Sequence, residues 1–381
     1  MMFTNKSKKI IHLPTTVGGN PQGISAAMKS LDFDSVSWST TQNYLKYKAD
    51  YIISENDNVF IKELKKLLAL RYIVKFDVVF FNFAQMLFKP HLDFEYRKFS
   101  VKYWPFIYLY CIYNRTMAQI EIFLLKMFQK KLIMQFQGDD IRQGDVCLNK
   151  FDISPAHSVE KHYYGARTDK MKRKIISFYE KHCDLIYYLN PDLKNVLGLK
   201  AKFLPYCHID LNDWTPCTIK ENKILKIGHA PSNRGFKGTG DILNVIKKLE
   251  DEGYEFEFVL IENVSHNEAK EIYKTLDIMI DQLYAGWYGG LAVELMALAV
   301  PVLCYIRESD LEHIPKNMAE DLPIINVNSE TLLDTLRKLL VSDRTDLKVI
   351  GKDSRAFVEK YHDSIVVAKS IVNDFENYSI L

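Results

Sequence analysis

The pattern of apolar and polar residues predicts alternating strands and helices in the C-terminal half of the chain. A short apolar strand begins at Ile224 and runs into a polar loop, and the amphipathic run from Ile242 to Leu249 predicts the helix that follows. Farther along, a helix is predicted from about Leu291, and a short apolar strand led by Pro301 comes after it. Strands that alternate with helices are typical of an α/β domain with a parallel sheet.

The N-terminal half shows the same alternation. Residues 9–13 are a predicted strand, residues 14–23 a loop rich in glycine and proline, and residues 24–31 a predicted helix. Two apolar runs, residues 76–82 and 131–136, predict buried parallel strands, because a strand covered on both faces does not alternate with polar residues. Both halves are therefore expected to be α/β.

Composition narrows the class of protein. The chain has 381 residues, 48% of them hydrophobic and 26% charged, which is enough for two globular domains. A net charge of +2 and the lack of a binding signature predict no nucleic-acid partner. The six cysteines lack a C-x-x-C pair, the histidines lack zinc spacing, and no signal peptide opens the chain, so a cytoplasmic protein is expected.

A glycine pair before a helix is one candidate anion site. Gly289 and Gly290 allow a ligand to approach the backbone closely, and the amides that open the helix near Leu291 carry partial positive charge toward a diphosphate. Glu294, about one turn farther on, can accept hydrogen bonds from ribose hydroxyls. The alternative interpretation is the turn and N-cap of an ordinary βαβ unit.

Two cations three residues apart follow the strand that begins at Ile224. Arg234 and Lys237 stand where a parallel strand ends, and open α/β sheets bind ligands at that edge. Two positive charges suit a diphosphate. Solvated surface cations are the alternative for this motif alone, but its combination with the glycine pair and Glu294 in one domain favours a nucleotide-sugar site.

These segments resemble the C-terminal half of retaining GT-B glycosyltransferases, of the family-four type that builds bacterial surface polysaccharides. The resemblance lies in residues 230–239, 277–282 and 286–297. It implies an α/β protein of the GT-B fold, with two Rossmann-like domains whose parallel sheets face a central cleft. It also implies transfer of a sugar from a nucleotide diphosphate sugar to an acceptor hydroxyl, with retention of anomeric configuration.

The resemblance and the loop positions together give a set of donor-side residues. Arg234 and Lys237 are expected to stabilise the leaving diphosphate, and Asp139 is grouped with them as a catalytic candidate. The predicted donor-binding residues are Ser232, Asn233, Gly238, Ile261, Glu262, Tyr288, Gly289, Gly290, Leu291 and Glu294. The family often has two glutamates eight positions apart; here Glu294 matches the second, and Gly286 occupies the first position.

Acceptor-side candidates come from the N-terminal half. They are Gly18 and Gly19 in the glycine-rich loop, Asn82 at a strand end, and Gln137, Asp140 and Arg142 beyond the strand 131–136. An irregular βα connection is an alternative for the glycine-rich loop. Gln137 stands where the family often has histidine, and an amide cannot act as a general base. Asp139, Asp140 and Arg142 are interpreted as binding acceptor hydroxyls or positioning the sugar, with a structural pair of Asp140 and Arg142 as the alternative.

One tripeptide invites a metal hypothesis. Asp32 and Asp34 form the Asp-x-Asp pattern that chelates a divalent cation in the other large glycosyltransferase fold. The pattern falls between a predicted helix and a predicted strand at residues 35–39, which favours a turn. No metal and no cofactor are therefore expected, and the substrate is a nucleotide diphosphate sugar, most simply of UDP or GDP.

The turn-rich run after Leu204 predicts the domain boundary. The expected division is an N-terminal acceptor-side domain at 1–204, a linker at 205–222 and a C-terminal nucleotide-sugar domain at 223–363. A similar linker joins the two domains of GT-B enzymes. By the same resemblance, the helix in 364–381 is expected to cross back onto the N-terminal domain.

An aromatic segment suggests contact with a membrane surface. Tyr103 to Tyr113 is too short to span a bilayer, but cations flank it, as in an interfacial anchor. The equal alternative is that Ile120 to Phe128 is a core helix and the tyrosine-rich run packs under it. The first interpretation predicts a peripheral protein at the inner face of the plasma membrane.

The function predicted from the sequence is therefore a glycosyltransferase that acts on a glycan or lipid-linked acceptor in polysaccharide or glycoconjugate biosynthesis. Two alternatives stay open. One is a GT-B-like protein that binds a nucleotide sugar or a partner without catalysis, and the other is a nucleotide-sugar epimerase, which would need carboxylate bases that the sequence does not identify.

Overall fold

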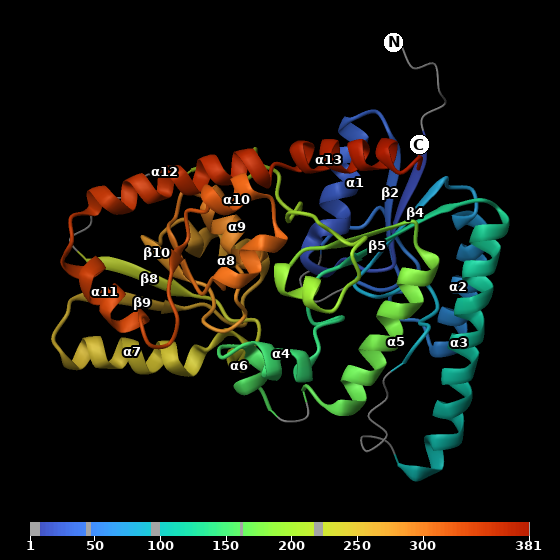
Figure 1. Ribbon diagram of the computed structural model, residues 1–381, viewed down its shortest axis with the longest axis horizontal. Helices are drawn as coiled ribbons and strands as arrows, with labels where there is room; N and C mark the ends of the chain where they lie inside the picture. The colour runs from blue at the N-terminus through green and yellow to red at the C-terminus, as the bar shows by residue number, and fades with distance from the viewer. Residues whose placement is uncertain (1–7, 43–46, 93–99, 161–162, 217–223, 381) are drawn as a thin grey trace. The chain divides into compact units, whose positions relative to one another are not determined.

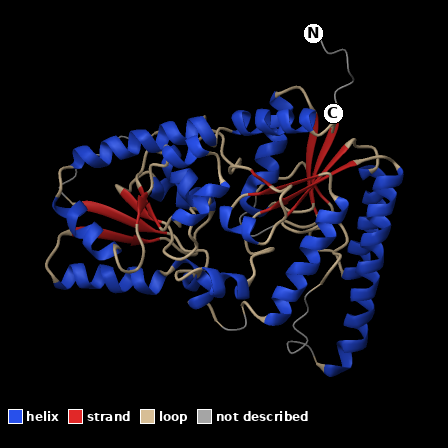
Figure 2. Ribbon diagram, in the orientation of Figure 1, coloured by secondary structure: helices blue, strands red, loops and turns tan. Residues whose placement is uncertain are grey.

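The computed structural model describes residues 8–42, 47–92, 100–160, 163–216 and 224–380, which divide into two compact units (Figure 1). Unit 1 consists of Met1–Gln143, Ala166–His208 and Ser364–Leu381. Unit 2 consists of Gly144–Gly165 and Ile209–Asp363. Each unit is built on its own parallel sheet with helices packed against it (Figure 2).

Unit 1 is a doubly wound domain. Its described strands are β1 (Lys9–Leu13), β2 (Asp34–Ser39), β3 (Tyr51–Ile52), β4 (Val78–Asn82), β5 (Lys131–Phe136), β6 (Leu185–Tyr188) and β7 (Lys202–Phe203). They lie in the order β3-β2-β1-β4-β5-β6-β7, and all neighbours are parallel. The helices are α1 (Asn20–Ser30), α2 (Val59–Ile73), α3 (Trp104–Met127), α5 (Ala166–His182) and α13 (Ser364–Asn377). The strand order reverses between β1 and β4, which is the position where such sheets bind ligands.

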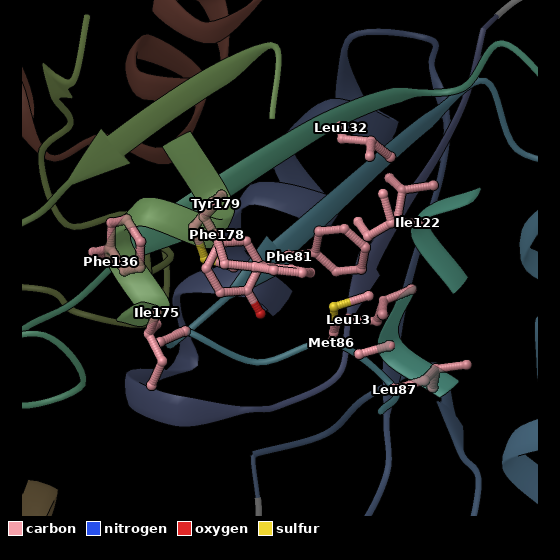
Figure 3. Close-up of a cluster of buried hydrophobic side chains, with 14 of the residues drawn as sticks. Leu13, Phe81, Met86, Leu87, Ile122, Leu132, Phe136, Ile175, Phe178 and Tyr179 are labelled. Carbon is pink, nitrogen blue, oxygen red and sulfur yellow. The ribbon is translucent and has the colours of Figure 1, made fainter. Parts of the chain in front are cut away.

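The core of unit 1 forms because its central strands are apolar on both faces. Every residue of β4 is buried, as the continuous apolar run predicted. On one face, Phe81 and Phe136 meet side chains from α3 and α5, among them Ile122 and Tyr179 (Figure 3). Burial of this apolar surface is the main favourable contribution to the folding of the unit.

The C-terminal helix belongs to unit 1. α13 packs against α1 and contributes the fully buried Ile371 and Phe375. Its Asp374 accepts a hydrogen bond of 3.0 Å from the Tyr187 hydroxyl at the end of β6 and pairs with Lys202 of β7. These contacts tie the last helix to the β6–β7 side of the sheet.

Unit 2 is a second doubly wound domain. Its described strands are β8 (Leu225–His229), β9 (Phe256–Leu260), β10 (Ile278–Ile280), β11 (Val302–Cys304) and β12 (Ile325–Asn326), all parallel and in the order β12-β11-β10-β8-β9. The helices are α4 (Gly144–Lys150), α6 (Arg234–Lys237), α7 (Thr239–Asp251), α8 (His266–Tyr273), α9 (Gly290–Ala297), α10 (Lys316–Glu320), α11 (Leu332–Val341) and α12 (Arg344–Tyr361). Here the order reverses between β8 and β10.

One segment differs from the predicted division at 204. Residues 144–165 lie within the predicted first domain but pack in unit 2, because Arg307 donates a 2.8 Å hydrogen bond to the carbonyl of Ile153 and lies 3.7 Å above the ring of Phe151. Of the predicted linker, residues 205–208 belong to unit 1 and 209–216 to unit 2, while 217–222 lie outside the described residues.

Two local predictions can be compared directly with the structure. Asp32 adopts the left-handed conformation in the turn between α1 and β2, in agreement with the turn predicted there. The aromatic segment and the run from Ile120 do not form two packed elements, because both belong to the single helix α3, which starts with Pro105 in its first turn.

The docking of α13 predicts a stability effect. Phe375→Ala should lower the stability of unit 1 by about 3–5 kcal/mol, because it leaves a cavity in place of a fully buried ring. Thermal denaturation followed by circular dichroism measures the loss. The exposed neighbour Asn373→Ala is the control on the same helix, and equal melting temperatures for the two variants would contradict the docking described here.

Candidate functional site

The end of β8 and the end of β10 carry a buried ion pair at the switch point of unit 2. Lys237, the last residue of α6, places its ammonium group against the carboxylate of Asp281, and both side chains are buried. The other oxygen of that carboxylate accepts the backbone N–H of Gly289 at 3.0 Å. The predicted cation and the predicted glycine pair therefore converge on one carboxylate.

The local sequence explains how Lys237 reaches this position. Asn233 caps α6 by accepting the N–H of Phe236 at 3.0 Å, so the short helix begins where the loop after β8 turns. Gly238 ends it with φ +77°, and a Cβ there would lie 3.1 Å from Leu283. Glycine is needed at this position both for the left-handed turn and for the close approach of the 281–289 loop.

Asp281 was not predicted as a site residue, although its segment carried part of the family resemblance. It directly follows the buried strand β10, as a charged residue at the carboxyl edge of a parallel sheet. That position is the one sequence feature that could have identified Asp281 as a site residue. Its choice of partner depends on the neighbouring strand β8 and could not be deduced from nearby sequence.

Arg234 is exposed and already paired. Its guanidinium group holds Glu262 through two hydrogen bonds, from Nε at 2.8 Å and from Nη2 at 2.5 Å. The hydrogen bond from Arg234 lowers the pKa of Glu262 below its usual value. The structure thus brings together two residues predicted for the donor site, one after β8 and one after β9, on the same edge of the sheet.

Glu294 is a buried carboxylate on α9 whose partner is His266. His266 Nε2 lies 2.8 Å from Glu294 Oε1, and this hydrogen bond raises the pKa of the imidazole. His266 is the first residue of α8, fixed by a capping box in which Ser265 and Glu268 exchange hydrogen bonds. No local pattern in the sequence points to this histidine, because it pairs with a residue 28 positions away on another helix.

The remaining donor-side candidates occupy different environments. Gly290 and Leu291 form the partly exposed start of α9, next to the Asp281 carboxylate that holds Gly289. Ser232 is exposed in the loop after β8, and the N–H of Ile261 is bonded to the carbonyl of His229 at 2.8 Å. Tyr288 is instead fully buried, with its hydroxyl 2.8 Å from His362 Nε2, so its side chain belongs to the core.

The missing first glutamate has a physical explanation. Gly286 adopts φ +79°, and a Cβ at this position would lie 2.5 Å from the guanidinium group of Arg307. Arg307 is fixed there by Asp310, at 2.7 Å, and by the carbonyl of Ile153. Arginine therefore occupies the space that a side chain at 286 would need.

In unit 1, the glycine-rich loop lies beside the loop after β5. Gly18 and Gly19 both have positive φ, and a Cβ on Gly19 would come within 2.9 Å of the ring of Tyr47. A Cβ on Gly18 would be 3.4 Å from Gln137 Oε1. Asn82 joins the ends of β1 and β4, since it donates to the carbonyl of Leu13 at 3.0 Å and accepts from Thr15.

The charged residues after β5, which are Asp139, Asp140 and Arg142, form hydrogen bonds that stabilise the loop they belong to. Asp140 is partly buried and accepts the N–H groups of Gln137 and Gly138, and its desolvation raises its pKa to about 6. Arg142 donates to Asp139 at 2.7 Å and to Asp192 at 2.6 Å. Asp139 keeps a partly exposed side chain. A role for Asp139, Asp140 or Arg142 toward a substrate stays a prediction.

Within the described residues, no group of three or more histidine, cysteine, aspartate or glutamate side chains is arranged to hold a metal ion. None of the helices in that part of the chain combines the length and the apolar character needed to cross a membrane.

The His266–Glu294 pair predicts a dependence of stability on pH. Because the folded pKa of His266 is raised, its contribution is complete below the usual value of 6.5 and is lost as the pH rises through the folded pKa. The melting temperature of wild type should exceed that of His266→Gln most at about pH 6 and least at about pH 9. His313→Gln is the control for loss of another partly exposed histidine. If the difference in melting temperature between wild type and His266→Gln does not change with pH, the pairing of His266 with Glu294 is refuted.

Neither a protein-family model nor a curated protein sequence matches the chain. Solved structures do match it over nearly the full length of both chains. Sucrose-phosphate synthase from Thermosynechococcus elongatus is 10% identical, with 97% of this chain and 99% of that chain covered and a TM-score of 0.59. The HepE protein of Anabaena, in complex with UDP-glucose, is 10% identical, with coverages of 98% and 100% and a TM-score of 0.59.

A glycosyltransferase from Rickettsia africae is 13% identical, with coverages of 98% and 99% and a TM-score of 0.57. At such low identity the shared property is the fold. Two doubly wound parallel domains and these likenesses agree with the expectation from the sequence. The chain has the GT-B fold found in glycosyltransferases.

Proposed function

We propose that the protein is a glycosyltransferase that moves a sugar from a nucleotide diphosphate sugar, with UDP or GDP as the nucleotide, to an acceptor hydroxyl. One observation carries this proposal. At the switch point of unit 2, the Lys237 ammonium, the Gly289 amide and the start of α9 are held together by Asp281. A cation beside aligned backbone amides is suited to a diphosphate.

The residues of unit 2 can be given roles in the departure of the diphosphate. Lys237 and the amides of Gly290 and Leu291 stabilise the negative charge that grows on the leaving group. Asp281 acts through Lys237, because it fixes the position of the ammonium group. Arg234 is exposed, and rotation away from Glu262 lets it contact the diphosphate. Glu294 on the same helix receives the ribose hydroxyls.

Two further points support a nucleotide-sugar donor and favour a particular stereochemistry and biosynthetic role. The HepE structure, which shares the fold, holds UDP-glucose. The resemblance of residues 230–239 and 286–297 to the family-four type favours retention of anomeric configuration and a role in polysaccharide or glycoconjugate biosynthesis.

Arg234→Ala should weaken the binding of UDP or GDP by about 10- to 100-fold, the effect of losing one charge-assisted hydrogen bond. Isothermal titration of both nucleotides measures the change. Arg337→Ala is a matched control, because Arg337 forms the same two-bonded surface pair with Glu252 in the same unit but belongs to α11. Equal affinity in both variants would remove Arg234 from the site.

A transfer assay separates the alternatives. Binding of a nucleotide sugar without release of the nucleoside diphosphate in the presence of lipid and glycan acceptors would favour the binding protein, and formation of an epimeric nucleotide sugar would favour the epimerase. Release of the nucleoside diphosphate that depends on an acceptor supports glycosyl transfer.

The acceptor side of the proposal is a lipid-linked molecule reached from a membrane surface. The exposed apolar side chains of α2 and α3 include Phe60, Leu64, Leu67, Leu68, Trp104, Phe106, Tyr108, Leu109, Ile112 and Phe123. The exposed charges of these two helices, Lys65, Arg71, Arg115 and Lys126, are all positive, while Glu63 and Glu121 are buried. Exposed apolar residues with positive charges alone suit an anionic lipid surface. We term these residues the α2–α3 face.

Wild type should therefore bind vesicles that contain phosphatidylglycerol and should be partly released by high salt, because salt screens the cations and not the apolar contacts. Phe60→Ser with Phe106→Ser should abolish most of this binding without lowering the melting temperature, since these side chains are 88% and 70% exposed. Cosedimentation measures binding.

The control double variant carries Leu199→Ser and Val341→Ser, which are also highly exposed but lie outside the α2–α3 face. Absence of vesicle binding by wild type would leave a soluble acceptor as the simpler proposal.

A further inference from the structure

A cavity of about 350 Å³ lies in unit 1 at the ends of its strands. Residues 14–17 after β1, 39–41 after β2 and 85–87 after β4 line it, together with side chains of α2 and α3. This is the switch point of the unit 1 sheet, where the order reverses between β1 and β4. Asn82, a predicted acceptor-side residue, ends β4 but does not line the cavity, and none of the lining residues was predicted as a site residue from the sequence.

The cavity carries an excess of positive charge. Lys62, Lys66 and Lys89 line it, and Glu63 is the one carboxylate among the described lining residues. Glu63 is engaged by Lys66 at 2.9 Å and by the Tyr110 hydroxyl at 2.8 Å. Lys66 therefore compensates Glu63, and the charges of Lys62 and Lys89 remain in excess. We term this cavity the lysine pocket.

The chemistry of the lining favours one ligand group. Thr40 and Thr41 also line the pocket, and their hydroxyl groups together with the lysine ammonium groups are donors suited to phosphate oxygens. The side chain of Lys66 is only 5% exposed, so this part of the lining is shielded from water and an anion that enters gains more than it would at an open surface.

We propose that the lysine pocket binds the phosphate or diphosphate group of a phosphorylated acceptor, a conclusion that rests on the proposed glycosyl transfer and names its acceptor class. The helices that supply Lys62, Lys66 and Tyr110 also form the α2–α3 face on their outer side. A lipid phosphate can therefore place its anionic group in the pocket while its chain stays in the membrane. A soluble sugar phosphate offers the same anionic chemistry.

The first test uses inorganic pyrophosphate as the probe, with UDP added at saturating concentration so that the diphosphate site of unit 2 is occupied. The double variant Lys62→Ala with Lys89→Ala should bind pyrophosphate at least about tenfold more weakly than wild type in isothermal titration. The control Lys65→Ala with Lys75→Ala removes two charges from the same region without touching the pocket lining. Equal pyrophosphate affinity in wild type and both variants would overturn the proposal.

The pocket and the donor site are tested separately. UDP affinity should be unchanged in the Lys62 and Lys89 variant, because unit 2 is intact. If wild type binds no nucleotide, the proposed function fails. The pyrophosphate comparison still decides whether the lysine pocket binds a phosphate group.

The second test distinguishes the two sources of phosphate. Phosphatidylcholine vesicles that contain phosphatidic acid are compared with vesicles of equal surface charge that contain phosphatidylserine. Loss of a preference for phosphatidic acid in the Lys62 and Lys89 variant, but not in the Lys65 and Lys75 control, supports a lipid acceptor. Loss of pyrophosphate binding with unchanged vesicle binding supports a soluble phosphorylated acceptor.

Discussion

The buried carboxylate of Asp281 is the constraint on which the candidate site of unit 2 depends. A buried charge without partners is strongly destabilising, so this side chain must hold a cation and a hydrogen-bond donor. It takes the ammonium group of Lys237 and the N–H of Gly289. The loop after β8, the end of β10 and the start of α9 are thereby fixed together before any ligand arrives, which reduces the reorganisation that binding requires.

Unit 1 uses the same sheet architecture with different groups at its switch point. Asn82 joins the ends of β1 and β4 by neutral hydrogen bonds, and the lysines come from α2 and the loop after β4. The small net charge of +2 conceals this arrangement. On the α2–α3 face the acids are buried and the exposed charges are positive, so the local charge and not the total determines which partners the surface attracts.

The sequence predicted the fold well because continuous apolar strands and their following loops are local signals. The strands predicted at 9–13 and 131–136 agree with β1 and β5, and the carboxyl-edge rule identified Lys237 as a site candidate. Contacts between distant segments were not predictable. Three examples join segments that only the folded sheet brings together. They are the pairing of Arg234 with Glu262, the pairing of His266 with Glu294, and the attachment of residues 144–165 to unit 2. α3 was divided in the prediction because it has apolar residues on its exposed side as well as its buried side, so periodicity does not reveal its orientation.

The contact between Gly286 and Arg307 couples two positions that lie 21 residues apart in the chain. A glutamate at 286 would force Arg307 to move, because its Cβ would lie 2.5 Å from the guanidinium group, and the backbone there, with φ +79°, favours glycine. Loss of Arg307 alone would leave Asp310 buried without its cation and Ile153 without its donor. Each single change is thus disfavoured, so a side chain at 286 requires a second change at 307 together with new partners for Asp310 and for the carbonyl of Ile153.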